Sequence, residues 1–518
     1  MASILSARFS APGPAEALHE ARISLRRAQY DRVLDLLSEC EDWPHPTAEQ
    51  GILLKAETLG RRDPADALVY LGTVDDMLVT NDGRFGQAVE TARFLAASRD
   101  LERAAHWYRH ARTLAATVPF GEQTLAYHLV RMRWFQRDCD PDAPEIAIAL
   151  VHPDPSIVAA TYAYRGWLHA GRGEYRAQIR DFQRVLACRP VDDLPIDLAT
   201  VATTVHALAR VAFEIADDEG VETARTAFDA IRWTADVDLE RFGTIRALGW
   251  DAFMRGQAAR AQWAFRDAKS LAPSTAWQVI LHLDRAYVAR IARNEVWALE
   301  ELTEADRLAH DVAWESTFGE ERQALVMLAA LHAQSDAGRA MRYAARYAQL
   351  GVENVNPALA IAGDRRTTAA QQYAQGLIEL AFGRRAAALP TLFDAYEIYA
   401  SASHHYRATL VAIALAEVTG EARWSAASRM HASRYPNCPL AAMADEAAAR
   451  HDSLPSELTP FQRQLARAVW TGVENAELSR RFSRSLYTIE REIGRICRAF
   501  GVADRDELRE HVRRLGLQ

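Results

Sequence analysis

Pairs of glycines seven residues apart recur along this chain, and their spacing is the strongest constraint on its fold. A glycine inside a helix lets a second helix approach closely, and a glycine at a helix end can adopt the positive φ that turns the chain. The stretches between the pairs show helical rather than strand periodicity. The sequence therefore predicts an all-α chain built from short helical hairpins. The pairs are Gly166 with Gly173, Gly249 with Gly256, and Gly376 with Gly383.

Small and bulky apolar residues follow each glycine pair at matching offsets. After the second pair they are Ala261, Phe265 and Ala268, and weaker versions recur elsewhere, as at Tyr30 with Val33. This pattern resembles the tetratricopeptide (TPR) repeat, a unit of roughly 34 residues. The resemblance implies that hairpins stack into a TPR-like α-solenoid with a groove for a peptide or protein. We expect a sensor or interaction domain over residues 1–440. An irregular helical array is the alternative.

Aromatic side chains cluster near the first glycine pair and allow two interpretations. Tyr162, Tyr164 and Trp167 could line the groove of the expected solenoid. Aromatic residues at such spacing are more often part of a core.

Composition points to a soluble protein of a reducing compartment. No stretch approaches the 18 apolar residues that a membrane-spanning helix needs, and the five cysteines are scattered. We therefore expect a cytoplasmic protein that does not associate with a membrane.

The charge of the chain is unevenly distributed: residues 455–518 carry a net +3, although the whole chain carries −8. A mildly basic tail on an acidic body is typical of an attached DNA-binding module.

Motifs for catalysis or cofactor binding are missing from the sequence. Neither of the two lysines, Lys55 and Lys269, follows a glycine in a phosphate-binding loop. There is no nucleophile elbow, zinc-ligand set or dinucleotide fingerprint. The adjacent His404 and His405 are expected to be surface histidines. We predict no catalytic residues, no cofactor and no metal, and hence that the protein is not an enzyme.

The last sixty residues predict four short helices after a linker at 441–457. Thr459 with Gln462 is a capping pair for a helix that reaches about Trp470. A helix over 475–482 and a turn at 483–485 follow, and Ser485 is the expected N-cap of a third helix that Gly501 ends. Asp504 begins the fourth helix.

The third helix of this tail has two distinct faces. Ile489, Ile493, Ile496 and Phe500 form one apolar stripe at spacings of 4, 3 and 4. Three arginines have the same spacing on the opposite side and are expected to face outwards. A short helix, a tight turn and a longer helix with an arginine face suit recognition of a DNA major groove. The arginines are Arg491, Arg495 and Arg498.

Residues 458–518 resemble the LuxR-type (GerE-like) helix-turn-helix. Leu458-Thr459-Pro460, Gly472, Asn475, Thr488-Ile489 and Gly501-Val502 fall at the family's spacings. The resemblance implies a four-helix module whose third helix enters the major groove of double-stranded DNA, and it implies a homodimer on DNA. The residues that it assigns to DNA contact are Arg484, Tyr487, Thr488, Glu490, Arg491, Arg495 and Arg498.

Several positions depart from the family pattern. Phe461 and Gln462 replace an arginine and a glutamate, Glu474 replaces a small N-cap residue, and Gly494 occupies a frequent contact position. Glu490 and Glu492 stand where basic residues are common, and acidic residues on a recognition helix repel phosphates. Ala499 also replaces a basic residue.

The sequence thus predicts a DNA-binding transcriptional regulator, an activator by family resemblance, whose TPR solenoid receives a peptide or protein signal. The acidic substitutions keep a second interpretation open, a protein–protein adaptor with a degenerate helix-turn-helix that does not bind DNA. A third is that the groove binds a small molecule.

Overall fold

The computed structural model describes residues 13–136, 138–191, 194–317, 319–333, 335–350, 365–452, 458–470 and 472–514. The chain divides into two compact units. Unit 1 comprises residues 1–211 and 219–244, and unit 2 comprises residues 212–218 and 245–518. Apart from an isolated bridge between Val191 and Leu194, the described residues form helices, turns and loops, which confirms the predicted all-α class.

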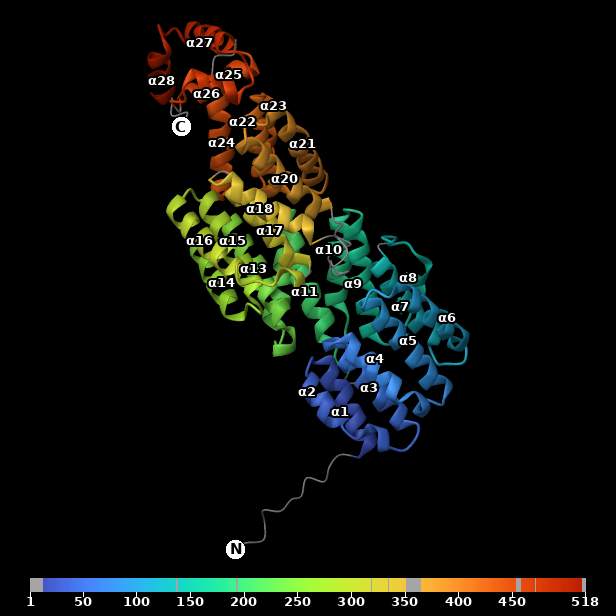
Figure 1. The fold of residues 1–518 in the computed structure, drawn as a ribbon. Helices are drawn as coiled ribbons and strands as arrows, with labels where there is room; N and C mark the ends of the chain where they lie inside the picture. Colours follow the sequence, from blue (N-terminus) through green and yellow to red (C-terminus); the bar gives the residue numbers. More distant parts are fainter. Residues whose placement is uncertain are drawn as a thin grey trace. The chain divides into compact units, whose positions relative to one another are not determined.

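Unit 1 consists of helices paired into antiparallel hairpins that lie side by side (Figure 1). The helices are α1 (Pro14–Arg26), α2 (Tyr30–Leu36), α3 (Thr47–Arg62), α4 (Pro64–Thr73), α5 (Asn81–Ala97), α6 (Leu101–Ala115), α7 (Gly121–Gln136), α8 (Pro144–Ala149), α9 (Pro155–Gly171), α10 (Tyr175–Ala187) and α12 (Asp218–Ala230). The division between the units passes through α11 (Leu198–Glu214) and α13 (Asp238–Met254).

Unit 2 continues the hairpin arrangement and then carries the four tail helices. Its array consists of α14 (Ala258–Leu271), α15 (Thr275–Ile291), α16 (Glu295–Ala309), α17 (Gly319–His332), α18 (Ala337–Gln349), α20 (Arg365–Ala381), α21 (Arg385–Ser401), α22 (His405–Thr419), α23 (Ala422–Ala432) and α24 (Pro439–Asp452). The tail consists of α25 (Pro460–Trp470), α26 (Asn475–Arg481), α27 (Leu486–Phe500) and α28 (Arg505–Arg514).

The glycine pairs act as the sequence predicts. Each second glycine has positive φ in the turn between two helices: +78° at Gly173, +76° at Gly256 and +73° at Gly383. Each first glycine lies against the second helix of its hairpin. A Cβ added at Gly166 would be 2.7 Å from the Phe182 ring. The close approach of α9 to α10 therefore requires the missing side chain.

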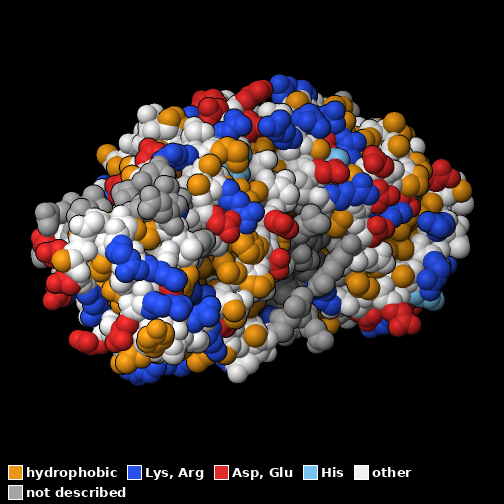
Figure 2. Space-filling view, turned by 90° about the horizontal axis from the view of Figure 1, so that it is seen from above, with side chains coloured by type: hydrophobic (Ala, Val, Ile, Leu, Met, Phe, Trp, Pro, Cys, Tyr) orange, Lys and Arg blue, Asp and Glu red, His pale blue; other side chains and the backbone are white. Residues whose placement is uncertain are grey.

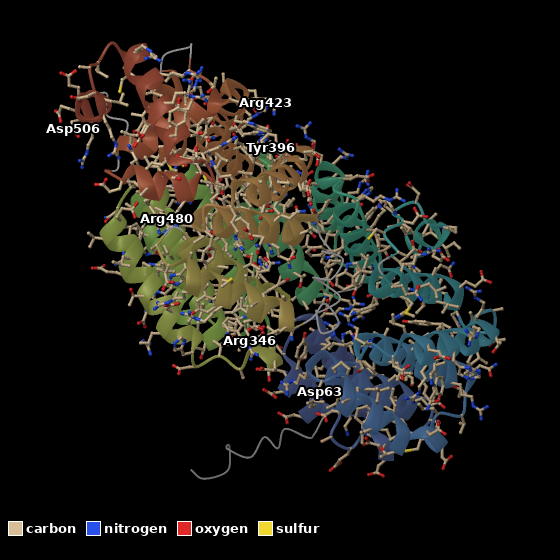
Figure 3. All side chains as sticks on the ribbon, turned by 45° about the horizontal axis from the view of Figure 1, so that its top comes forward. Asp63, Arg346, Tyr396, Arg423, Arg480 and Asp506 are labelled. Carbon is tan, nitrogen blue, oxygen red and sulfur yellow. The ribbon has the colours of Figure 1, made fainter. Side chains whose placement is uncertain are left out.

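Aromatic packing also joins neighbouring hairpins in unit 2. Tyr396, labelled in Figure 3, extends from α21 to α23, where its ring packs edge-on against Trp424 and its hydroxyl lies 3.2 Å from His431 Nε2. Such contacts between successive hairpins bury apolar surface that one hairpin cannot cover alone.

The stretch predicted to be a linker begins inside a helix. Residues 439–452 form α24, in which Leu440, Ala444 and Ala448 are completely buried. Apolar residues at intervals of four allow this helix to pack on the array. Residues 453–457 lie outside the described part of the chain. None of the described helices combines the length and apolarity needed to cross a bilayer.

Candidate nucleic-acid interface

The tail helices begin and end at the expected caps. The Thr459 amide donates to Gln462 Oε1 at 2.9 Å, and the Gln462 amide donates to Thr459 Oγ1 at 3.2 Å. Ser485 Oγ accepts from the Thr488 amide at 3.2 Å, which makes Ser485 the N-cap of α27. Gly501, with φ +66°, ends this helix. These hydrogen bonds satisfy backbone groups that a helix end otherwise leaves unpaired.

The apolar stripe of α27 forms the centre of the tail. Ile489, Ile493 and Ile496 are buried and pack in one cluster with Leu465 of α25, Leu478 of α26 and Leu508 of α28. Because the cluster includes residues from all four helices, it fixes how α27 is rotated about its own axis. The face of α27 opposite the isoleucines must therefore lie towards solvent.

The solvent side of α27 carries most of the residues assigned to DNA contact. Tyr487 is 70% exposed, and Thr488 is half-buried beside Ser485. Figure 2 looks down on the end of the molecule that carries the tail, where Lys and Arg side chains stand among acidic and hydrophobic ones. The remaining assigned residues are all exposed: Arg484, Glu490, Arg491, Arg495 and Arg498.

Glu492 is buried, although it was expected on the exposed surface of α27. It is 6% exposed, accepts from Gln462 Nε2 at 2.7 Å, and pairs with Arg495 at 2.7 Å and with Arg491 at 3.5 Å. Glu492 therefore does not stand on the exposed face of α27: its carboxylate is turned inward and paired with both arginines. Two departures from the family pattern, at 462 and 492, thus bind each other and join α25 to α27.

Two other departures have simpler outcomes. Glu474 precedes α26 but its side chain makes no capping hydrogen bond. At Gly494, an added Cβ would meet nothing within 4 Å, so the glycine leaves open space on α27.

A large cavity lies in unit 2 and reaches the tail. It has a volume of about 1170 Å³ and is lined by side chains of α15, α17, α20, α22 and α24, with Tyr287, Tyr373 and Met443 among them. Arg481, the last residue of α26, is also part of the lining. The wall of the cavity carries charges of both signs, since Arg293 pairs there with Glu446. The sequence did not reveal this cavity, since its lining comes from helices far apart in the chain.

The second helix of the tail contacts the array beside this cavity. The Arg385 guanidinium lies 5.6 Å from the centre of the Phe482 ring, and the Arg481 side chain approaches Gly383. Both contacts involve the turn between α20 and α21. The turn of one repeat and the end of α26 are therefore adjacent.

The histidine prediction is wrong at His404. This residue has no exposed surface and lies 3.5 Å from Glu214 in unit 2, because it occupies the turn where α21 meets α22. His405 instead faces His431, with the two Nδ1 atoms 3.0 Å apart. Among the described residues, no group of three or more metal-binding side chains gathers at one point.

Comparisons with known proteins do not assign this chain to a family. No family model matches the sequence, and no curated protein matches it either. Among solved structures, the chain is similar to "Crystal structure of APC/C hetero-tetramer Cut9-Hcn1", with 13% identity and a TM-score of 0.32, over 85% of this chain and 90% of that chain. A likeness of this degree carries no argument about function.

Proposed function

We propose that this chain is a sequence-specific regulator of transcription that binds double-stranded DNA through α27. The observation that carries the proposal is the division of α27 into a buried isoleucine side and an exposed side bearing arginines. A helix fixed in this way can lie in a major groove, where guanidinium groups donate to guanine edges or phosphates. Because one such module covers a half-site, the regulator acts as a cytoplasmic homodimer on DNA.

The array of unit 2 is the proposed receiver of a peptide or protein signal. Its cavity of about 1170 Å³ exceeds most small-molecule sites and offers both apolar and charged walls. Arg481 belongs to the wall and to α26 at once, so an occupant that contacts it acts on the tail directly. Such an occupant changes DNA binding only if it binds better to one placement of α26 than to another. Resemblance to the LuxR type favours activation over repression.

Exposed arginines at the two ends of α27 provide the test. Arg484→Ala combined with Arg498→Ala is expected to reduce genome occupancy and duplex binding, because each substitution removes a guanidinium contact with a base edge or a phosphate. A lost base contact alone weakens binding by about 1–3 kcal/mol. Neither side chain is buried, so far-ultraviolet circular dichroism should remain unchanged. The measurement is chromatin occupancy in cells, followed by duplex titration on the recovered sites.

The matched control is Arg103→Ala, which removes an arginine that is 71% exposed on α6 of unit 1. It is expected to leave occupancy unchanged. Equal occupancy by the double variant and the unmodified protein would contradict DNA recognition through α27.

A protein–protein adaptor is the second candidate, and one contact favours it. Arg491 and Arg495 both point at Glu492, which reduces the positive charge they present to a phosphate. In an adaptor, the arrays bind partners and the tail is a docking surface. Unchanged occupancy in the double variant, together with partner binding that depends on cavity residues, would support this alternative.

A further inference from the structure

The first and last hairpins of unit 1 contact each other. Arg26 of α1 pairs with Asp154, which precedes α9, and donates to the Pro195 carbonyl at 3.2 Å. The Tyr30 amide donates to Asp236 at 3.1 Å. Unit 1 therefore closes on itself. The first helices of successive hairpins, α3, α5, α7 and α9, lie beside one another, and their side chains meet on one face, which is called the interior from here on.

Charged side chains occupy this interior in pairs one helical turn apart. On α3, Arg61 donates to Glu57 at 2.9 Å and to Asp197 at 2.7 Å. On α5, Arg93 pairs with Glu90 and lies 3.8 Å from Glu57. Residues three or four apart share one helix face. Hence α3 and α5 present their charges to the same space.

The next two helices add an arginine and aromatic rings. Arg131 of α7 lies over the Tyr164 ring of α9, with 5.8 Å from Cζ to the ring centre. The Tyr127 and Tyr164 rings are 6.1 Å apart, and Trp134 packs edge-on against Tyr164 at 5.6 Å. Tyr127, Arg131 and Trp134 have spacings of 4 and 3, so they share the inward face of α7.

Several buried donors in this interior have no acceptor. Arg93 is 7% exposed and its Nε is unpaired, as are Arg131 Nε and Trp134 Nε1, and Trp134 is also 7% exposed. Arg131 makes no ion pair with any described residue. A buried donor without an acceptor destabilises a fold, so several in one place require an explanation.

The cluster is accessible as well as polar. The side chains of Arg61 and Glu57 remain 20% and 28% exposed, and Tyr127, Arg131 and Tyr164 are half-buried. Burial raises the pKa of Glu90 to about 7, against the opposing effect of Arg93, so the carboxylate loses its charge near neutrality. The interior then has a surplus of positive charge and of donors.

We propose that the interior of unit 1 binds a small organic anion, whose carboxylate or phosphate group is held by Arg93 and Arg131 and whose planar part packs against Tyr127 and Tyr164. Oxyanions accept several hydrogen bonds at once and satisfy guanidinium donors in pairs. The aromatic rings provide a flat surface for an attached ring. This inference is independent of DNA binding by the tail.

The test is thermal unfolding of the full chain with benzoate, phenyl phosphate and uncharged benzamide. We expect saturable stabilisation by at least one of the two anions and none by benzamide. A response to benzoate alone identifies a carboxylate ligand, and a response to phenyl phosphate alone identifies a phosphate ligand. Tryptophan fluorescence gives a second readout, because Trp134 lies in the interior. Equal responses to all three compounds, or no saturable response to either anion, would overturn the proposal.

Arg131→Met distinguishes a binding role from a structural one. It removes the guanidinium but keeps an apolar side chain of similar length, so far-ultraviolet circular dichroism should show that the free protein is folded. The concentration of anion for half-maximal stabilisation should rise at least about tenfold. Arg109→Met, at an exposed position on α6, is the control and should bind as the unmodified protein does. Unchanged anion binding by Arg131→Met would also overturn the proposal.

Glu90 gives the site a defined pH dependence. Benzoate binding should strengthen as the pH falls through about 7, because Glu90 then releases Arg93 from its ion pair. Benzoate remains ionised throughout this range. Glu90→Gln should bind benzoate strongly at all these pH values, and a pH dependence that survives the substitution would place the anion elsewhere. The groups that face Glu90 are Glu57 and Arg61 of α3, Arg93 of α5, Tyr108 of α6 and Arg131 of α7.

Discussion

Single residues set the packing distance within each hairpin. At Gly166, Gly249 and Gly376 the missing side chain leaves room for a bulky residue of the second helix. These glycines were predictable, because their role depends on residues close in sequence. The burial of Glu492 was not predictable, because its partner Gln462 lies on another helix thirty positions away.

Gly166→Ala is expected to destabilise unit 1 by about 1–3 kcal/mol, since its new Cβ would collide with a completely buried ring. Urea unfolding followed by tryptophan fluorescence measures the change. Gly72→Ala is the matched control, because a Cβ there meets nothing within 4 Å. The control should be neutral or up to about 1 kcal/mol more stable. Equal midpoints for both variants would contradict this account of the glycine.

Helices are joined to one another by buried polar side chains as well as by apolar contact. Asp306 of α16 accepts from His332 of α17 at 3.0 Å and from Tyr343 of α18 at 2.6 Å, and it pairs with Arg339. Burial alone would raise the pKa of Asp306, but these hydrogen bonds lower it to about 2. The periodicity of the sequence predicts helices in this region but does not identify the side chain that joins them.

Asp306→Asn is expected to destabilise unit 2 by about 3 kcal/mol at neutral pH, because it removes the carboxylate that the buried His332 and the partly exposed Arg339 and Tyr343 share. The pKa of Asp306 is lower in the folded protein than in the unfolded chain, so the stability that its carboxylate contributes is fully present above about pH 4. It is lost as the pH falls through about 2. Chemical unfolding at several pH values should show the two proteins converging in acid. Asp311→Asn, at a side chain that is 68% exposed, should behave as the unmodified protein. A constant difference down to the lowest pH would argue against this role.

The charge of the whole molecule bears on the DNA binding proposed for the tail. The chain has a net charge of −8, and the basic residues of the tail must act against the acidic remainder. In the proposed complex, attraction to phosphates is therefore local to the exposed arginines of the tail. The basic tail was evident from the sequence, whereas the inward turn of Glu492 and the cavity beside α26 were not.

Binding of the full chain to duplex DNA is expected to weaken with salt, because arginine–phosphate contacts release counterions. Arg498→Ala should reduce the slope of log K against log salt by about 1 if Arg498 contacts a phosphate. Fluorescence anisotropy over a salt series measures both slopes. Salt-independent binding would argue against an electrostatic contact by the tail.

The sequence alone determined the helices, their caps and the two faces of α27, because these depend on residues within a few positions of each other. Periodicity places Ile489 and Ile493 on one side and Arg491 on the other, whatever surrounds them. The tertiary structure decided which distant side chains meet. It placed Glu492 against Gln462, brought Arg93 and Arg131 into the closed interior of unit 1, and formed the cavity that Arg481 shares with the array. Contacts across such separations depend on how hairpins stack, and local sequence carries no record of that stacking.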